Sequence, residues 1–200
     1  MMIKLNMYCL LFITIIFFSG CNEELAKTPK PHMYSRIIFP EHHYQHFDSM
    51  LCNFYFKYPL YSKIIKDSIQ FEGRAPNDCW FDINSKELNT SIHCSYYKIS
   101  NQKNLSSLVA DAFEIADKHN IKANFRKETV IKNTFGVQGI LFDIEGPVAS
   151  PVQFYLTDGK LHFFRASLYF NSKVNPDSTA IVLKFVKQDI DTLISTFNWE

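Results

Sequence analysis

The sequence lacks an excess of charge of either sign. Its 200 residues include 21 lysines and arginines and 20 aspartates and glutamates, a formal net charge of +1. Without residues 1 to 20, which contain one lysine and no acid, the two signs balance. A nucleic-acid-binding protein is expected to carry a basic stripe or patch, so the composition argues against nucleic acid as a partner.

Glycine is scarce as well, with only six residues, whereas aromatic residues make up 16% of the chain. Disordered segments have few aromatic residues and low hydrophobicity, and this chain has the opposite composition. The 180 residues after position 20 are enough for one domain with a sizeable core. We therefore expect a single globular domain, which we place at residues 35–200.

A long hydrophobic run is also missing. The uncharged apolar stretch from Met7 to Phe18 has 12 residues, whereas a helix needs roughly 20 to cross a bilayer. With Lys4 before it, the stretch fits the hydrophobic region of a cleaved signal peptide. This predicts that residues 1–20 are a signal peptide.

The residues that follow, Ser19-Gly20-Cys21, resemble a bacterial lipobox, in which the cysteine is lipidated and becomes the new N-terminus. Phe18 departs from the usual aliphatic residue of that motif, and an ordinary secretory signal or an uncleaved anchor remain as alternatives. Acyl chains on Cys21 would anchor the protein stably to membrane lipid, because each buried methylene contributes about 0.8 kcal/mol. Residues 21–34, with two prolines that favour an extended chain, are the predicted tether.

Cysteine is limited to three residues after Cys21, namely Cys52, Cys79 and Cys94. An oxidising compartment allows one disulfide among them and leaves one thiol free. Cys52–Cys79 would close a 28-residue loop. Cys79–Cys94 is an equal alternative if residues 81–83 and 91–93 form a hairpin, which would bring those two cysteines opposite each other.

Hydrophobic periodicity predicts strands, then a helix, then strands, then a closing helix. Residues 152–157 are expected to pair with residues 161–171 through the Asp158-Gly159 turn, because an Asp-Gly turn between two β-rich runs is typical of a hairpin. The expected fold class is α+β, an antiparallel-dominated sheet with two helices packed on it. The element order resembles the PsbP/Mog1-type α/β/α sandwich. The predicted strands lie within 36–39, 53–58, 61–71, 79–83, 90–99, 124–131, 137–144, 152–157 and 161–171, the helices at 106–120 and from the cap at 175 onward, and residues 41–49 are expected to form a loop.

Motifs for catalysis and cofactors are missing from the sequence. There is no G-x-S-x-G elbow, no Walker A motif and no dinucleotide fingerprint. His42, His43 and His46 form the most metal-like cluster, but no cysteine or carboxylate has suitable partner spacing, so we interpret them as surface-loop residues. The sequence therefore predicts no catalytic residue, no metal site and no cofactor.

A rim site for a partner is the remaining candidate. Pro151 removes a hydrogen-bond donor from its strand, which places this end of the strand at an edge or rim, and arginine and aromatic side chains commonly anchor interfaces. The alternative is a strand start with a structural proline and an arginine satisfied by local carbonyls. The residues predicted to dock a partner are Ser150, Pro151, Gln153, Tyr155, Arg165 and Tyr169.

Several stretches together resemble the gliding motility lipoprotein GldD family of Bacteroidota. They are Arg36-x-x-x-Pro40, Phe47-Asp48, Cys52, Cys79-Trp80, residues 150–154 with Thr157-Asp158, residues 162–171, residues 175–178, Asp189-Ile190 and Trp199. The resemblance covers the whole chain after the lipobox. It favours Cys52–Cys79 as the disulfide.

The resemblance also implies a function. It implies a non-enzymatic outer-membrane lipoprotein needed for gliding, with partners among the envelope proteins of the gliding and type IX secretion apparatus. The main alternative is a small-ligand-binding protein of the sandwich class on the periplasmic side. An envelope hydrolase comes third, and would need a nucleophile, a base and an orienting group within hydrogen-bond reach of one another.

Overall fold

The computed structural model describes residues 37–47, 52–66 and 77–200, which belong to one unit, Ile37–Glu200. The predicted signal peptide and tether, including Cys21, lie outside the described residues. No helix among the described residues is long and apolar enough to cross a membrane.

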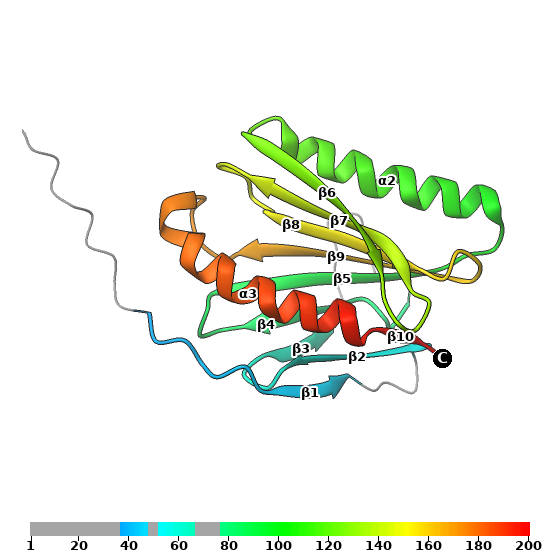
Figure 1. Cartoon of the computed structure of the whole chain (residues 1–200), viewed down its shortest axis with the longest axis horizontal. Helices are drawn as coiled ribbons and strands as arrows, with labels where there is room; N and C mark the ends of the chain where they lie inside the picture. The colour runs from blue at the N-terminus through cyan, green and yellow to red at the C-terminus, as the bar shows by residue number, and fades with distance from the viewer. Residues whose placement is uncertain (1–36, 48–51, 67–76) are drawn as a thin grey trace, which may run out of the picture. The chain divides into compact units, whose positions relative to one another are not determined.

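Two antiparallel sheets form the frame of the domain (Figure 1). The larger has seven strands in the order β3-β4-β5-β9-β8-β7-β6, and the smaller has three in the order β1-β2-β10. The strands are β1 Tyr44–Phe47, β2 Phe54–Pro59, β3 Lys63–Lys66, β4 Phe81–Ser85, β5 Thr90–Lys98, β6 Phe125–Lys132, β7 Gln138–Glu145, β8 Val152–Thr157, β9 His162–Phe170 and β10 Asn198–Trp199.

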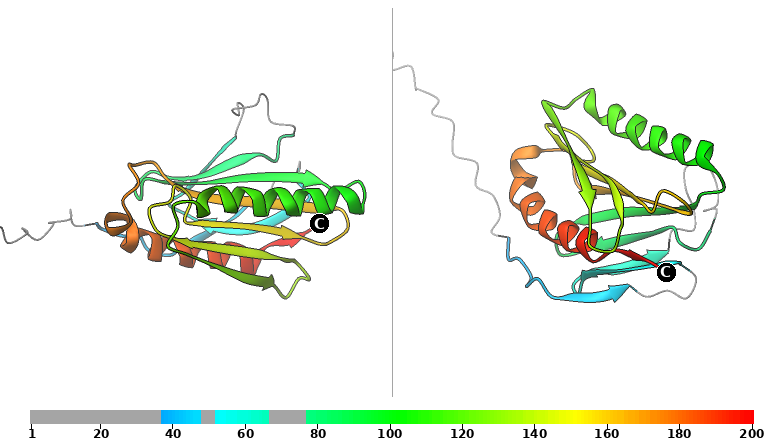
Figure 2. Two further views of the ribbon diagram at one scale, coloured as in Figure 1. Left: turned by 90° about the horizontal axis from the view of Figure 1, so that it is seen from above. Right: turned by 45° about the vertical axis from the view of Figure 1, so that its right-hand side comes forward.

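Two helices, α2 (Gln102–Asn120) and α3 (Pro176–Thr196), lie on opposite faces of the larger sheet (Figures 1 and 2). Side chains alternate between the faces of a strand, so Phe163 packs in the cluster that holds the apolar side of α2, whereas Phe164 packs in the cluster that holds that of α3. The result is a three-layer α/β/α arrangement, which confirms the predicted α+β class with two helices on an antiparallel sheet.

Asparagine caps fix where both helices begin. The Asn101 side chain accepts a hydrogen bond from the Asn104 N–H at 2.9 Å, and the Asn175 side chain accepts one from the Ser178 N–H at 3.4 Å. Each cap satisfies a backbone donor that the first turn leaves unpaired. The cap at Asn175 was predicted, whereas the cap at Asn101 starts α2 four residues before the predicted position 106.

Stacked phenylalanines join the smaller sheet, the larger sheet and the end of α3. Phe56 of β2 stacks on Phe47 of β1 at 4.7 Å and on Phe197, after α3, at 5.8 Å between ring centroids. Phe197 also lies 5.0 Å from Phe164 of β9. All four rings are buried. Aromatic ring pairs stabilise a fold by more than the apolar area that they bury. Because these rings come from both sheets, this block joins the two sheets in one core.

The N-terminal part of the domain differs from the sequence prediction. Residues 37–39 were predicted as a strand and are irregular, while the predicted loop at 41–49 contains β1. Residues 37–39 are held by side-chain packing, since the Phe39 ring stacks on Phe185 of α3 at 4.6 Å. Strand β1 forms because it pairs with β2 along its full length and buries Phe47.

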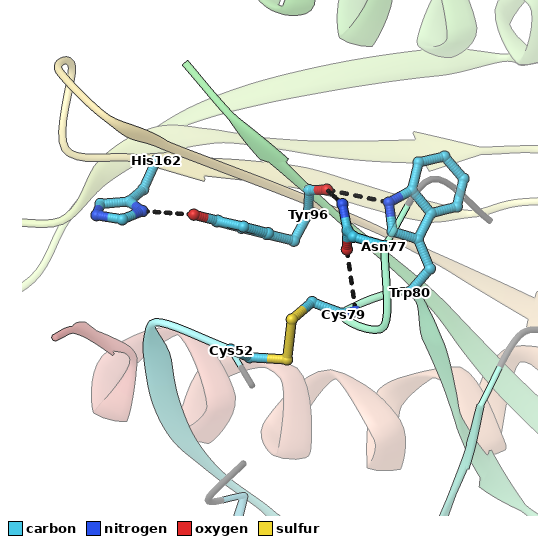
Figure 3. The surroundings of a disulfide bond; sticks show 6 residues. All are labelled: Cys52, Asn77, Cys79, Trp80, Tyr96 and His162. Atoms are coloured by element: carbon cyan, nitrogen blue, oxygen red, sulfur yellow. Dashed lines mark hydrogen bonds between the residues drawn. A yellow bond between two sulfur atoms is a disulfide. The ribbon is translucent and has the colours of Figure 1, made fainter. Parts of the chain in front are cut away.

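A disulfide joins Cys52 to Cys79, with 5.7 Å between their Cα atoms (Figure 3). It links the start of β2 in the smaller sheet to the start of β4 in the larger. The alternative Cys79–Cys94 disulfide does not form because the register of β4 and β5 does not bring these two cysteines opposite each other. Phe81 lies opposite Cys94, which puts position 79 opposite Tyr96. Cys94 is a free, buried thiol, and burial raises its pKa well above the ordinary value.

A buried carboxylate on α3 holds two further segments. Asp189, 2% exposed, accepts hydrogen bonds from the hydroxyls of Tyr44 (3.0 Å) and Tyr61, and its carboxylate lies 2.8 Å from Nδ1 of His42. Burial and the neighbouring carboxylate raise the pKa of Tyr61, so this phenol stays a donor. A buried charge requires such partners. The network therefore fixes β1 and the turn before β3 against α3.

Removing the disulfide is expected to destabilise the domain. Replacing Cys52 and Cys79 together by alanine should lower the free energy of unfolding by about 3.5 kcal/mol, the value for a loop of this length in the chain-entropy model. Urea denaturation of the purified mature protein measures it. Cys94→Ala is the control, because it keeps the disulfide, and a reductant should lower its stability but not that of the double variant. An unchanged urea midpoint in the double variant would contradict a stabilising disulfide.

Removing one hydroxyl from the Asp189 network is also expected to cost stability. Tyr61→Phe should lower the free energy of unfolding by about 1.5–3 kcal/mol, because a hydrogen bond to a buried charged group is lost. Tyr58→Phe is the matched control, since the Tyr58 hydroxyl has no hydrogen-bond partner among the described residues. If both variants unfold at the same denaturant concentration as the wild type, the network does not contribute to stability.

Candidate functional site

A groove of about 460 Å³ opens between the first half of α3, the loop that joins β7 to β8 and the loop that joins β9 to α3. Its volume lies within the range of small-molecule sites. Most of its wall is apolar. The apolar wall is formed by Ile144, Val148, Ala149, Pro151, Phe170, Val174, Ala180 and Leu183.

Four charged side chains line the same groove. Lys187 of α3 bonds both carboxylate oxygens of Asp143 on β7, at 2.8 and 2.6 Å. Lys184, one turn earlier on α3, and Glu145 on β7 are both exposed, and neither has an ion-pair partner among the described residues. The groove therefore combines an apolar wall with a cation and an anion, Lys184 and Glu145, that form no ion pair within the described part of the chain.

The structure divides the six residues predicted to dock a partner. Ser150, Gln153 and Tyr155 are buried, and Tyr155 stacks on Phe163 at 5.2 Å in the core beneath α2. These three side chains are therefore not placed to contact a partner. Gln153 and Tyr155 lie on the same face of β8, which packs in the core beneath α2, and Ser150 is buried just before the strand.

The other three predicted docking residues lie closer to the surface. Pro151 is buried but forms part of the groove wall, and Tyr169 lines the groove and is partly exposed. The Arg165 guanidinium, also partly exposed, lies 5.8 Å from the ring centroid of Tyr97 and donates to its hydroxyl at 3.4 Å. Arg165 is thus held by a neighbouring aromatic side chain, whereas the alternative prediction had it bound by local carbonyls.

The three histidines of the metal-like cluster point to different partners. His42 contacts Asp189, His43 contacts Glu41 at 2.8 Å, and His46 lines a small hollow with Phe47, Tyr55 and Glu200. Among the described residues, no three histidine, cysteine or acidic side chains gather as metal ligands.

Several residues of the family-like motifs meet in one structural network around the disulfide (Figure 3). The Asn77 amide and the Trp80 indole N–H both donate to the Tyr96 carbonyl at 3.0 Å, and the Tyr96 hydroxyl lies 2.7 Å from Nδ1 of His162. The His162 ring stacks on Trp199 at 5.1 Å. These contacts hold the ends of β4, β5, β9 and β10 together, so the motif residues are structural here.

The Thr157-Asp158 pair completes this network. Asp158 accepts hydrogen bonds from the N–H groups of Lys160, Leu161 and His162, each at 2.9 Å. Burial alone would raise the pKa of Asp158, but these three hydrogen bonds lower it below the ordinary value. Burial lowers the pKa of His162, so its ring favours the neutral form that packs on Trp199.

Sequence reasoning missed the groove itself. Ala180, Leu183, Lys184 and Lys187 are spaced along one face of α3, which is the helical signal that could have identified them. The loops that complete the walls give no such periodic signal.

Comparison with known proteins identifies the chain. No curated protein matches it. Among solved structures, it is similar to cyanobacterial PsbP (CyanoP) from Synechocystis sp. PCC 6803, with a TM-score of 0.47 and 14% identity over 78% of this chain and 92% of that one. The family model described as gliding motility lipoprotein GldD matches residues 24–199, nearly the whole chain, and the chain therefore belongs to the gliding motility lipoprotein GldD family.

Proposed function

We propose that this protein is an outer-membrane lipoprotein that acts as an accessory or assembly factor of the gliding and type IX secretion apparatus. The observation that supports the proposal is the family match over residues 24–199. In this proposal Cys21 carries the acyl chains, the prolines of residues 21–34 keep the tether extended, and the domain works by binding other envelope proteins rather than by catalysis.

The surface proposed to dock a partner is centred on Arg165 and Tyr169. Both project from β9 toward the face of the sheet that carries α2, where the Tyr169 ring lies 5.0 Å from that of His93 and 6.2 Å from that of His119. Arginine and tyrosine with part of their surface exposed are typical anchors of protein interfaces. This narrows the predicted set of six residues to Arg165 and Tyr169, whose side chains are partly exposed.

A deletion strain of the native host tests the proposal. The deletion is expected to abolish both colony spreading and export of type IX cargo, and the wild-type gene should restore both. The Cys21→Ala gene should fail to restore them, because it removes the anchor. Normal spreading and export in the deletion strain would contradict a role in this apparatus.

The docking surface is tested in the same strain with a matched pair of charge reversals. Arg165→Glu is expected to reduce rescue, whereas Lys160→Glu, the same change at the exposed tip of the β8–β9 hairpin, should rescue fully. Envelope levels of both variants are compared by immunoblotting, so that loss of the protein is not mistaken for loss of docking. Full rescue by Arg165→Glu at normal levels would exclude this surface.

A further inference from the structure

The described chain begins at the same end of the domain as the first half of α3 (Figure 1). The Phe39 ring, close to this start, stacks on Phe185 of α3. The adjoining turns of α3 form one wall of the groove. The sixteen residues from Cys21 to Arg36 reach at most about 55 Å when fully extended, so anchoring at Cys21 would keep the domain within that distance of a bilayer.

The groove wall is largely apolar and partly open to solvent, since Val174, which lines it, is 46% exposed. An apolar surface of this kind that remains exposed indicates a binding surface. A lipid acyl chain is the apolar ligand that the tether would supply at high effective concentration.

The charges at the groove indicate which kind of head group it accepts. Lys187 is occupied by Asp143, so it does not require a further anion. Lys184 and Glu145 remain without ion-pair partners among the described residues. This cation and this anion complement a head group that carries both signs, with the phosphate toward Lys184 and the ammonium toward Glu145.

We propose that this groove binds one acyl chain of a zwitterionic membrane phospholipid, with its head group between Lys184 and Glu145. The proposal rests on the lipid anchor proposed above but not on the role in gliding or secretion. Bound lipid would hold this end of the domain against the membrane, in addition to the covalent anchor.

Binding of lysophosphatidylethanolamine tests the proposal. The protein is the complete mature chain, residues 21–200, with Cys21→Ala so that it carries no lipid of its own. Calorimetric titration below the critical micelle concentration is expected to show saturable binding of one lysolipid for each chain. Absence of saturable binding would overturn the proposal. The assay involves no gliding or secretion, so its failure leaves the proposed role in the apparatus untouched, and failure of the deletion experiment leaves this result standing.

A matched pair of tryptophan substitutions locates the binding. Ala180→Trp places a large ring in the groove and should weaken binding about tenfold or more. Ile181→Trp adds a similar ring at the adjacent exposed position, outside the groove lining, and should bind like the parent. Both positions are exposed on α3, and thermal unfolding verifies that both variants fold. Equal lysolipid affinity in the two folded variants would exclude the groove as the site.

A charge swap tests the head-group assignment. Lys184→Glu should weaken lysolipid binding about fivefold, the effect expected from losing one surface ion pair. Adding Glu145→Lys to that variant should recover most of the affinity, because the two charges exchange places. Unchanged binding by Lys184→Glu would overturn the assignment of the phosphate to Lys184.

Discussion

The block of stacked phenylalanines on the α3 side of the larger sheet is the contact on which the rest of the structure depends. Rings from β1, β2, β9 and the segment after α3 meet there. Fully burying a phenylalanine contributes about 1.5–3 kcal/mol, so a few such rings compare with the whole stability of a domain. The disulfide and the Asp189 network lie at the border of this block, where they fix the smaller sheet and the first residues of the domain to a core that already exists.

Much of the fold follows from the sequence because its signals are local. The β8 strand has its predicted bounds, the Asp158-Gly159 turn joins β8 to β9 as the hairpin signal indicated, and Asn175 caps α3. The strand β1 could not be predicted in this way. Its polar and aromatic residues become a strand only because they pair with β2 and bury Phe47, which is a contact that a local pattern does not record.

The candidate site was less predictable for a related reason. Alternation along β8 and β9 gives two faces, but it does not say which part of a face a helix covers. Ser150, Gln153 and Tyr155 were predicted to dock a partner and are buried, while Arg165 and Tyr169 remain partly exposed. The groove beside α3 needs two loops that are distant in sequence to pack against one helix, so only its helical wall had a detectable pattern. Its position near the start of the described chain connects the proposed lipid site with the proposed anchor.

The proposed anchor at Cys21 is tested by mass spectrometry of the protein isolated from the envelope of its native host. If Cys21 is lipidated, the N-terminal peptide begins at Cys21 and carries acyl chains on that cysteine. A peptide that begins at another residue, or an unmodified Cys21 in the mature protein, would contradict it.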